Sequence, residues 1–388
     1  MIKKWIIDMP SLKLGDIILT SEKSLASKGV RAATLSKYSH AAIYVGGTMI
    51  EATLDGVFSK NPQRLLFDSE KQVAVYRYRA ELDETQIENI CNSARSKTAS
   101  LYTIPEAATL RIREILNKPE SKKQFCSRLV ALSFSENDID LGNIRNPAYC
   151  TPKQLSLCKA FYKVSNIVRE ANEQEINFAK TDDPNILHQK DTMAWVNKVR
   201  ELVKTENLSR DFDIQSITDV DEFLKLNHQF DDIIVSYIKS GGYLTHYNFD
   251  TKRNPYRYNP ILLELVAKEQ NNKDSFFEEQ LFNGFDIINI YSNNLNRYLN
   301  YYVNNSLNYY REHCLLYMNL LTGIYVRMKY LNQVSKKYHN DNIAARSGEV
   351  MRVAAVNCGK GKEILGLCVH GSHEQELQRN HRRYRGDV

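Results

Sequence analysis

The sequence has little of what marks several common classes of protein. Its seven cysteines are odd in number, widely scattered and form no Cys-x-x-Cys pair, which disfavours a disulfide framework and favours a reducing compartment. Long apolar runs are missing too: the N-terminal run stops at Asp8, and the stretch 314–331 is interrupted by Asn319, Arg327 and Lys329. We therefore expect neither a signal peptide nor a transmembrane helix.

Size and charge set further bounds. A chain of 388 residues exceeds one typical hydrophobic core, so we expect two domains. The formal net charge of +6 is modest for this length; it permits an acidic partner and does not indicate nucleic acid. Because no signal-like segment is visible, we expect the protein to be cytoplasmic at synthesis, and secretion by a signal-independent route stays open.

The types of local pattern change along the chain. Residues 1–165 alternate short β-rich runs with helices, which predicts an α+β domain. Residues 166–215 are rich in Asn, Asp, Glu and Lys and are interpreted as a helical connector. The last part, 216–388, is predicted to be mainly helical, with long helical patterns at 219–239, 260–269 and 284–340. It ends in a basic tail with Arg379, Arg382, Arg383 and Arg385.

Within the first domain the local signals predict strands, a hairpin and three helices. Two β-rich runs flank Gly46-Gly47, which is a hairpin signal. Asp83 and Gln86 form a capping pattern at the start of a helical run. We expect strands at 14–20, 39–45, 48–52 and 73–78, and helices at 83–97, 105–117 and 124–134.

One cysteine, Cys126, stands at the start of the helix predicted at 124–134. A helix N-terminus presents free backbone N–H groups and partial positive charge, which lower the pKa of a thiol and can hold a developing oxyanion. The alternative is a buried structural cysteine, the usual place of a lone thiol. This segment alone leaves both interpretations open.

The hairpin puts a histidine near a carboxylate. If the dipeptide Gly46-Gly47 forms the loop, Ala42 faces Glu51, and His40 shares a sheet face with both. His40 and Glu51 are then diagonal neighbours, roughly 7–8 Å apart at the backbone. Such a carboxylate can fix the tautomer of an imidazole that serves as a base for a nucleophile. An exposed His–Glu pair is the alternative, and a three-residue loop would put Glu51 on the opposite face.

Short segments along the N-terminal part, taken in order, resemble a known family. They read LGDII at 14–18, YSHAAIYVG at 38–46, IEA at 50–52 and FCSRLV at 125–130. This arrangement is similar to the circularly permuted branch of the NlpC-type, papain-like hydrolases, which includes the bacterial YiiX-type proteins and, more distantly, the lecithin retinol acyltransferases. In that branch the His-bearing strand precedes the Cys-bearing helix, as it does here. The resemblance covers roughly residues 11–165.

The resemblance implies a fold, a reaction and roles for particular residues. The fold would be an antiparallel sheet packed on helices, with a mainly α-helical domain after it. Cys126 would be the nucleophile, His40 the base and Glu51 the group that orients it, with a covalent acyl-enzyme. The substrate would be an amide in a peptide or peptidoglycan stem; a lipid ester or thioester, cleaved or used by an acyltransferase, is the alternative.

Other residues are candidates for contacts with the substrate or its oxyanion. Tyr102 resembles the aromatic residue that precedes the Cys-bearing helix in the family. A packing role or a helix-capping role explains Tyr38 and Gln124 equally well. The set is Tyr38, Tyr102, Gln124 and Ser127. The chain departs from the family at Thr103 and Arg128, where acidic or amide residues are common, and this affects the expected substrate contacts more than the chemistry.

We expect no metal and no cofactor. The soft ligands near the C-terminus lack zinc-site spacing; they are Cys358, Cys368, His370 and His373. The helical part, 216–388, carries no recognisable group of acid and base residues that could catalyse a reaction, so we expect it to bind a substrate or protein partner. A partner-binding module with a passenger hydrolase domain is the rival hypothesis, and the intact Cys126, His40 and Glu51 favour a working cysteine hydrolase. The missing export signal weakens a housekeeping cell-wall role and leaves two interpretations open, a delivered toxin or effector and an intracellular hydrolase.

Overall fold

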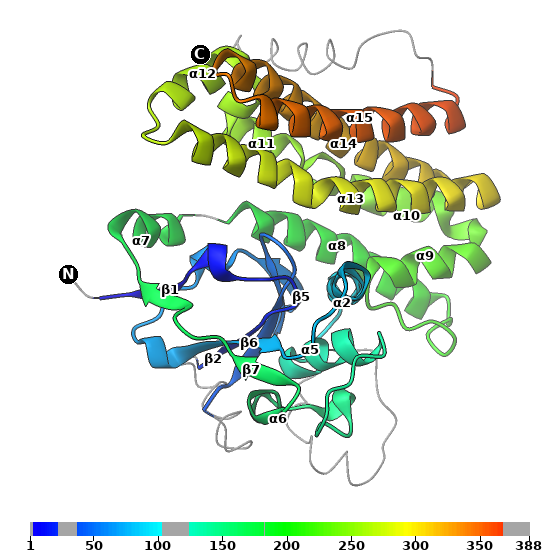
Figure 1. The fold of residues 1–388 in the computed structure, drawn as a ribbon. Helices are drawn as coiled ribbons and strands as arrows, with labels where there is room; N and C mark the ends of the chain where they lie inside the picture. The colour runs from blue at the N-terminus through cyan, green and yellow to red at the C-terminus, as the bar shows by residue number, and fades with distance from the viewer. Residues whose placement is uncertain (1–2, 22–36, 103–123, 182, 368–388) are drawn as a thin grey trace. The chain divides into compact units, whose positions relative to one another are not determined.

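The structure is a computed structural model (Figure 1), and it describes residues 3–21, 37–102, 124–181 and 183–367. The chain divides into two compact units, Met1–Phe223 and Leu224–Val388. The expected boundaries at 165 and 215 stay a prediction. The helix predicted at 105–117 and the basic arginines of the tail lie outside the described residues.

A six-stranded sheet forms the centre of the first unit. Its strand order is β5-β4-β3-β2-β6-β7, with every neighbouring pair antiparallel, and β1 and β8 form a separate antiparallel pair. The strands are β1 (Trp5–Ile7), β2 (Ile17–Thr20), β3 (His40–Tyr44), β4 (Met49–Thr53), β5 (Gly56–Lys60), β6 (Val73–Tyr78), β7 (Phe161–Lys163) and β8 (Val168–Glu170). The helices of this unit are α2 (Glu84–Ser96), α5 (Cys126–Ser135), α6 (Pro152–Leu157), α7 (Glu173–Lys180) and α8 (Pro184–Thr205), and α9 (Ile217–Leu226) crosses its end.

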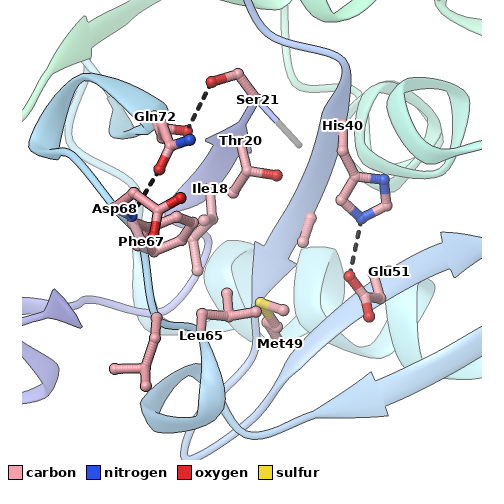
Figure 2. Close-up of a pocket in the computed structure, with 12 residues that line it drawn as sticks. Ile18, Thr20, Ser21, His40, Met49, Glu51, Leu65, Phe67, Asp68 and Gln72 are labelled. Carbon is pink, nitrogen blue, oxygen red and sulfur yellow. Dashed lines mark hydrogen bonds and ion pairs between the residues drawn. The ribbon is translucent and has the colours of Figure 1, made fainter. Parts of the chain in front are cut away.

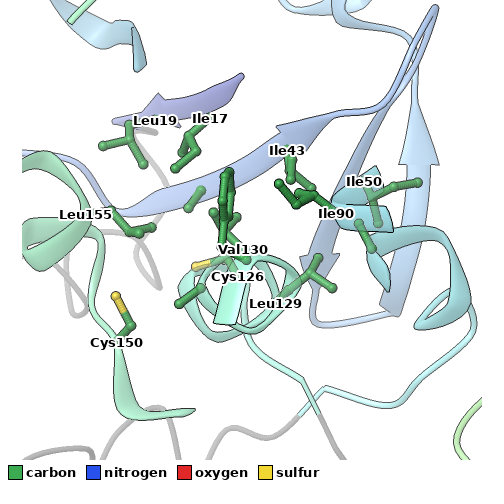
Figure 3. Close-up of a cluster of buried hydrophobic side chains, with 14 of the residues drawn as sticks. Ile17, Leu19, Ile43, Ile50, Ile90, Cys126, Leu129, Val130, Cys150 and Leu155 are labelled. Atoms are coloured by element: carbon green, nitrogen blue, oxygen red, sulfur yellow. The ribbon is translucent and has the colours of Figure 1, made fainter. Parts of the chain in front are cut away.

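The central strands are buried on both faces, which explains why β2 is apolar almost throughout. Alternate residues such as Ile17 and Ile43 pack with α2 and α5 in one core cluster (Figure 3). Their neighbours Ile18 and Ala42 pack on the other face, in a second cluster that includes Phe67. The sheet therefore separates the helical layer from a second apolar layer.

The predicted hairpin register is confirmed. Ala42 pairs with Glu51, and the Val45 N–H donates to the Thr48 carbonyl at 2.8 Å. The two loop glycines have φ values of 91° and 63°, the left-handed conformation that a tight two-residue turn requires and that glycine adopts without strain. The predicted strand 73–78 and the capping box of Asp83 and Gln86 at the start of α2 are also confirmed.

A buried carboxylate ties β2 to β6. Asp16 is fully buried and accepts hydrogen bonds from Arg77 Nε and Nη2, both at 2.7 Å. It also accepts from the Lys13 N–H at 2.8 Å. Three donors balance the desolvation of one buried charge, so the start of β2 is held against its neighbour.

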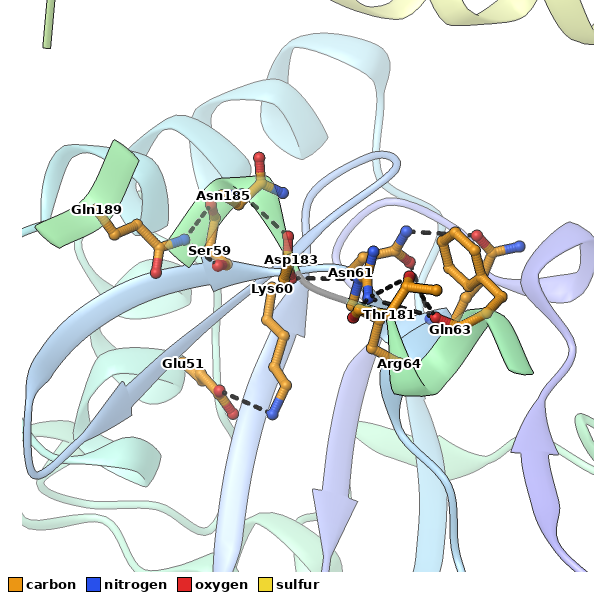
Figure 4. A network of polar contacts seen from close by, with 11 residues as sticks. Glu51, Ser59, Lys60, Asn61, Gln63, Arg64, Thr181, Asp183, Asn185 and Gln189 are labelled. Atoms are coloured by element: carbon orange, nitrogen blue, oxygen red, sulfur yellow. Dashed lines mark hydrogen bonds and ion pairs between the residues drawn. The ribbon is translucent and has the colours of Figure 1, made fainter. Parts of the chain in front are cut away.

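Residues 166–215 pack onto this sheet within the same unit. Arg64 forms an ion pair with Asp183 at 3.5 Å, and both side chains are almost completely buried (Figure 4). Gln189 of α8 donates to the carbonyl of Ser59 on β5. Further along α8, Arg200 Nη2 donates to the Ala99 carbonyl at 2.7 Å. This segment therefore packs against β5, the strand next to β4.

The second unit is helical, as the sequence predicts. Its helices are α10 (Asp231–Lys239), α11 (Asn248–Arg253), α12 (Pro260–Lys268), α13 (Lys273–Asn305), α14 (Asn308–Lys337) and α15 (Asp341–Ile364). The continuous pattern predicted at 284–340 is in fact two helices, broken where Ser306 adopts a left-handed conformation with φ of 54°. The Asp231 carboxylate stabilises the new start by accepting from the N–H groups of Asn308 and Tyr309 at 2.7 and 2.9 Å. None of the helices described here is both long and apolar enough to cross a membrane.

The Asp16→Ala substitution should destabilise the first unit strongly, because it leaves Arg77 without its buried partner. We expect the free energy of unfolding to fall by about 3–5 kcal/mol. Both tryptophans of the chain, Trp5 and Trp195, lie in this unit, so tryptophan fluorescence during urea unfolding reports on it selectively. Glu170→Ala is the control, since its ion pair with Lys3 is largely exposed and should contribute less than about 1 kcal/mol. Equal losses of unfolding free energy in both variants would contradict the stabilising role given to the contact between Asp16 and Arg77.

Candidate active site

Cys126 is the first residue of α5, and its side chain is largely buried. Because α5 packs against β3, the sulfur receives backbone N–H hydrogen bonds from Ala41 of β3 and from Ser127 of its own helix. The position at the helix N-terminus is therefore the one that the sequence predicts. Both donors favour the thiolate over the thiol.

His40 lies between the cysteine and Glu51. Its Nε2 is 2.8 Å from Glu51 Oε2 (Figure 2), and its ring also forms a side-chain hydrogen bond with Cys126. Since Nε2 faces the carboxylate, Nδ1 is the nitrogen left for the thiol. The strand register brings His40 and Glu51 to one sheet face, as predicted. Hydrogen bonds then connect the Cys126 thiol to the His40 ring and that ring to the Glu51 carboxylate.

The electrostatics of the three groups favour a thiolate–imidazolium pair. Burial alone lowers the pKa of His40, but the hydrogen bonds and charges of Cys126 and Glu51 outweigh it, so that pKa lies well above its usual value. Burial alone raises the pKa of Cys126, but the hydrogen bond and charge of His40 and the two backbone N–H groups lower it below normal. Burial also opposes ionisation of Glu51, yet His40 and Lys60 bring its pKa below the usual range.

Lys60 is a member of the site that the sequence analysis missed. Its Nζ is 3.7 Å from Glu51 Oε1 (Figure 4). The residue ends β5, where it pairs with Met49 and is therefore diagonal to Glu51 on the same face. The alternation of side chains along β5 predicts this position of Lys60, but only once β5 is known to pair with β4.

Two of the four substrate-contact candidates lie beside the cysteine. Tyr102 and Gln124 form a parallel bridge, and the Gln124 N–H donates to the Leu101 carbonyl at 2.9 Å. Burial and the nearby charge of Cys126 raise the pKa of Tyr102. Gln124 is also buried, two residues before the cysteine.

The other two candidates make structural contacts. Tyr38 is buried in the core and hydrogen-bonds Tyr76, whose pKa burial and this contact raise to about 12. The Ser127 hydroxyl donates to the Cys150 carbonyl at 2.7 Å, so only its backbone N–H is directed at the sulfur. Arg128 is buried, with its guanidinium 5.8 Å from the centre of the Phe125 ring. Thr103 lies outside the described residues.

Of the four soft ligands near the C-terminus, Cys358 alone lies in the part that the structure describes. Cys358 lies in α15 and donates to the Met318 carbonyl at 3.6 Å. Cys368, His370 and His373 are outside the described residues. Across the described ranges, no group of three or more His, Cys, Asp or Glu side chains is arranged to hold a metal ion.

The fold and the Cys–His–Glu line define the class of protein: a helix-borne cysteine facing a histidine on an antiparallel sheet is the arrangement of a papain-like cysteine hydrolase. Comparison with protein families gives the particular group. Residues 11–148 match the permuted papain-like amidase enzymes of the YaeF/YiiX type, the C92 family, and this part of the chain is a domain of that kind. The predicted resemblance and the expected hydrolase class are confirmed. None of the curated proteins matches the chain.

Cys126 should be alkylated by iodoacetamide faster than Cys358, although Cys358 is the more exposed of the two. Iodoacetamide reacts with the thiolate, and the lowered pKa of Cys126 keeps it ionised at a pH where burial keeps Cys358 protonated. The Cys126 rate should therefore reach its plateau at a lower pH. Peptide mass spectrometry after timed labelling from pH 5 to 9 measures both sites.

His40→Ala removes the cation that lowers the thiol pKa. Labelling of Cys126 at pH 7 should then slow by about tenfold or more, since each unit of pKa above the solution pH costs about tenfold in thiolate. Cys358 labelling should not change. If Cys126 reacts no faster than Cys358 in the unmodified protein, the thiolate–imidazolium interpretation is wrong.

Proposed function

We propose that this domain hydrolyses an amide through Cys126, His40 and Glu51. The observation that carries the proposal is the continuous line from the sulfur through the imidazole to the carboxylate, with opposite pKa shifts at its first two members. A lowered thiol pKa beside a raised imidazole pKa gives a nucleophile and a proton donor at the same pH.

The reaction follows from this starting state. The Cys126 thiolate attacks the amide carbon and forms a C–S bond, and the carbonyl oxygen takes the negative charge. His40 then gives its Nδ1 proton to the amide nitrogen, the C–N bond breaks, and the amine leaves. Water attacks the acyl-enzyme while His40 takes its proton, and the C–S bond breaks to release the acid.

Glu51 and Lys60 support the histidine in this cycle. The Glu51 carboxylate accepts the Nε2–H of His40, so Nδ1 stays directed at the sulfur and the cationic ring is stabilised. Lys60 keeps Glu51 ionised. We assign the oxyanion to the backbone N–H of Ser127 at the start of α5, which the Cys126 sulfur releases when it loses its negative charge in forming the C–S bond.

We favour an amide in a peptide or peptidoglycan stem as the substrate, in keeping with the amidase family that residues 11–148 match. The helical second unit is assigned to recognition of the substrate or of a protein partner. Its described part holds buried aromatic contacts such as Tyr298 stacked on His313, with ring centres 4.5 Å apart, and burial lowers the pKa of that histidine to about 4. This is the behaviour of a core residue, so we assign no chemistry to it.

Substitutions at the three positions should separate their roles. Cys126→Ala should abolish turnover of a small activated ester, and His40→Ala should lower kcat/KM by about 10²- to 10⁴-fold. Glu51→Gln should lower kcat/KM less than His40→Ala does, because the ring keeps a hydrogen-bond partner but loses the charge. Glu170→Gln, on the exposed strand β8, is the matched control and should leave kcat/KM unchanged.

The pH profile of kcat/KM gives a second readout. The rate should rise as pH passes the lowered pKa of Cys126 and fall as pH passes the raised pKa of His40. Glu51→Gln should bring the alkaline limb to lower pH, since the imidazolium loses its anionic partner. An unchanged alkaline limb in that variant would remove Glu51 from the proposed triad.

A chain truncated after Phe223, the end of the first compact unit, should keep its activity on a small activated ester while losing activity on a muropeptide or a long peptide. Binding energy from a remote unit positions large substrates and contributes nothing to small ones. Circular dichroism and iodoacetamide labelling of Cys126 check that the shortened chain is folded. Equal losses on both substrates in a folded chain would show that the second unit contributes to catalysis itself.

A further inference from the structure

The Glu51 carboxylate has a second basic neighbour besides His40. Its Oε2 is 2.8 Å from His40 Nε2, and its Oε1 is 3.7 Å from Lys60 Nζ (Figure 4). The side chain of Glu51 is 10% exposed and that of Lys60 is 37% exposed, so a buried carboxylate faces an ammonium group that is in partial contact with water. The two carboxylate oxygens therefore interact with two different cations.

The end of β5 fixes the direction from which the ammonium group approaches. Lys60 is on the same sheet face as Glu51, because side chains alternate along the strand. The residue before it, Ser59, accepts a hydrogen bond through its carbonyl from Gln189 of α8. The residue after it, Asn61, caps the next turn with its side chain. The backbone is thus held on both sides of the lysine.

Two other acidic residues of this neighbourhood have cationic partners of their own. Asp68 lines the pocket of about 250 Å³ that opens beside Glu51, and its carboxylate is 2.6 Å from Lys4 Nζ. Past the end of β5, Asp183 pairs with Arg64 at 3.5 Å. The ammonium group at the end of β5 is therefore directed at the carboxylate of the active site.

A positive charge at this place acts on both members of the thiolate–imidazolium pair in the same direction. It favours the Cys126 thiolate and disfavours the His40 imidazolium, so it lowers the pKa of each. Glu51 has the opposite effect on His40, whose pKa it raises. Tyr102 adds no charge, because burial and the nearby Cys126 raise its pKa. Lys60 therefore offsets part of the effect of Glu51.

We infer that Lys60 is a positioning residue of this site, which shares the Glu51 carboxylate with His40 and keeps the active pH range lower than the three reacting residues alone would give. Lys60 makes and breaks no bond in the reaction. Its effect is to keep His40 acidic enough to give its proton to the leaving amine. The inference rests on the proposed cysteine hydrolase function, in which the thiolate–imidazolium pair is the active form.

Lys60→Met removes the charge and keeps a side chain of similar length. Both limbs of the pH profile of kcat/KM should then move to higher pH, by about half a pH unit at low salt, as expected for a partly exposed charge. The acid limb follows the pKa of Cys126, and the alkaline limb follows that of His40. Glu51 stays ionised at the alkaline limb, since His40 by itself also lowers its pKa. The alkaline limb thus moves in the direction opposite to that expected for Glu51→Gln.

The control variants separate charge from shape. Lys60→Arg keeps the charge and should keep both limbs, whereas Lys60→Gln is a second neutral variant and should shift them as Lys60→Met does. Lys3→Met removes a largely exposed lysine that pairs with Glu170, and should leave the profile unchanged. Raising the salt concentration from about 0.01 M to about 1 M should reduce the difference between Lys60→Met and the unmodified protein, because the Debye length falls from about 30 Å to about 3 Å.

The outcomes distinguish this inference from the function on which it rests. If iodoacetamide labels Cys126 no faster than Cys358 in the unmodified protein, the activated thiolate is wrong, and the role of Lys60 falls with it. If Cys126 is activated and the neutral variants keep both limbs in place, the hydrolase proposal stands and the role of Lys60 is overturned. Equal shifts in Lys60→Arg and Lys60→Met would also overturn it, since they would show that the charge is not the cause.

Discussion

The hairpin between β3 and β4 is the constraint on which the site depends. Two glycines with positive φ hold its loop at two residues, so Ala42 pairs with Glu51 and the carboxylate reaches His40 on the same face. A slip of one residue would move every side chain of one strand to the opposite face. The same strand also receives α5 on its other face, so a single register sets the distance between imidazole and carboxylate and the place of the sulfur.

Burial then determines the chemistry of that geometry. Each of the three groups would be disfavoured as an ion in an apolar environment, yet their mutual hydrogen bonds reverse this in all three cases. Lys60 further favours the ionised form of Glu51, and the backbone N–H groups at Cys126 further favour the thiolate. A buried pair of this kind costs stability when one member is removed, which links the integrity of the surrounding sheet to activity. The contact of Asp16 with Arg77 matters for the same reason, because it holds the start of β2 beside β3.

The two faces of the sheet pack against different layers. One face carries α5 and the cysteine, and the other carries a pocket of about 250 Å³ that is lined by both apolar and polar side chains, with His40 among them. Residues 166–215 pack against β5 and the turn after it: Gln189 donates to the Ser59 carbonyl, and Asp183 forms an ion pair with Arg64. They contribute no reacting group, but they fix the strand that carries Lys60.

The sequence by itself determined the local features of this protein. Glycine conformational freedom predicted the hairpin loop, alternation put His40 and Glu51 on one face, and the capping pattern of Asp83 and Gln86 marked the start of α2. Tertiary structure decided the helix break at Ser306, because the start of the next helix depends on the Asp231 carboxylate, which is distant in sequence. It also decided the role of Lys60, which the sequence analysis missed, because that role depends on the pairing of β5 with β4. The same holds for Tyr38, whose contact is with Tyr76 on another strand. Periodicity records which face of an element is buried, whereas only the packed chain determines which distant partner meets that face.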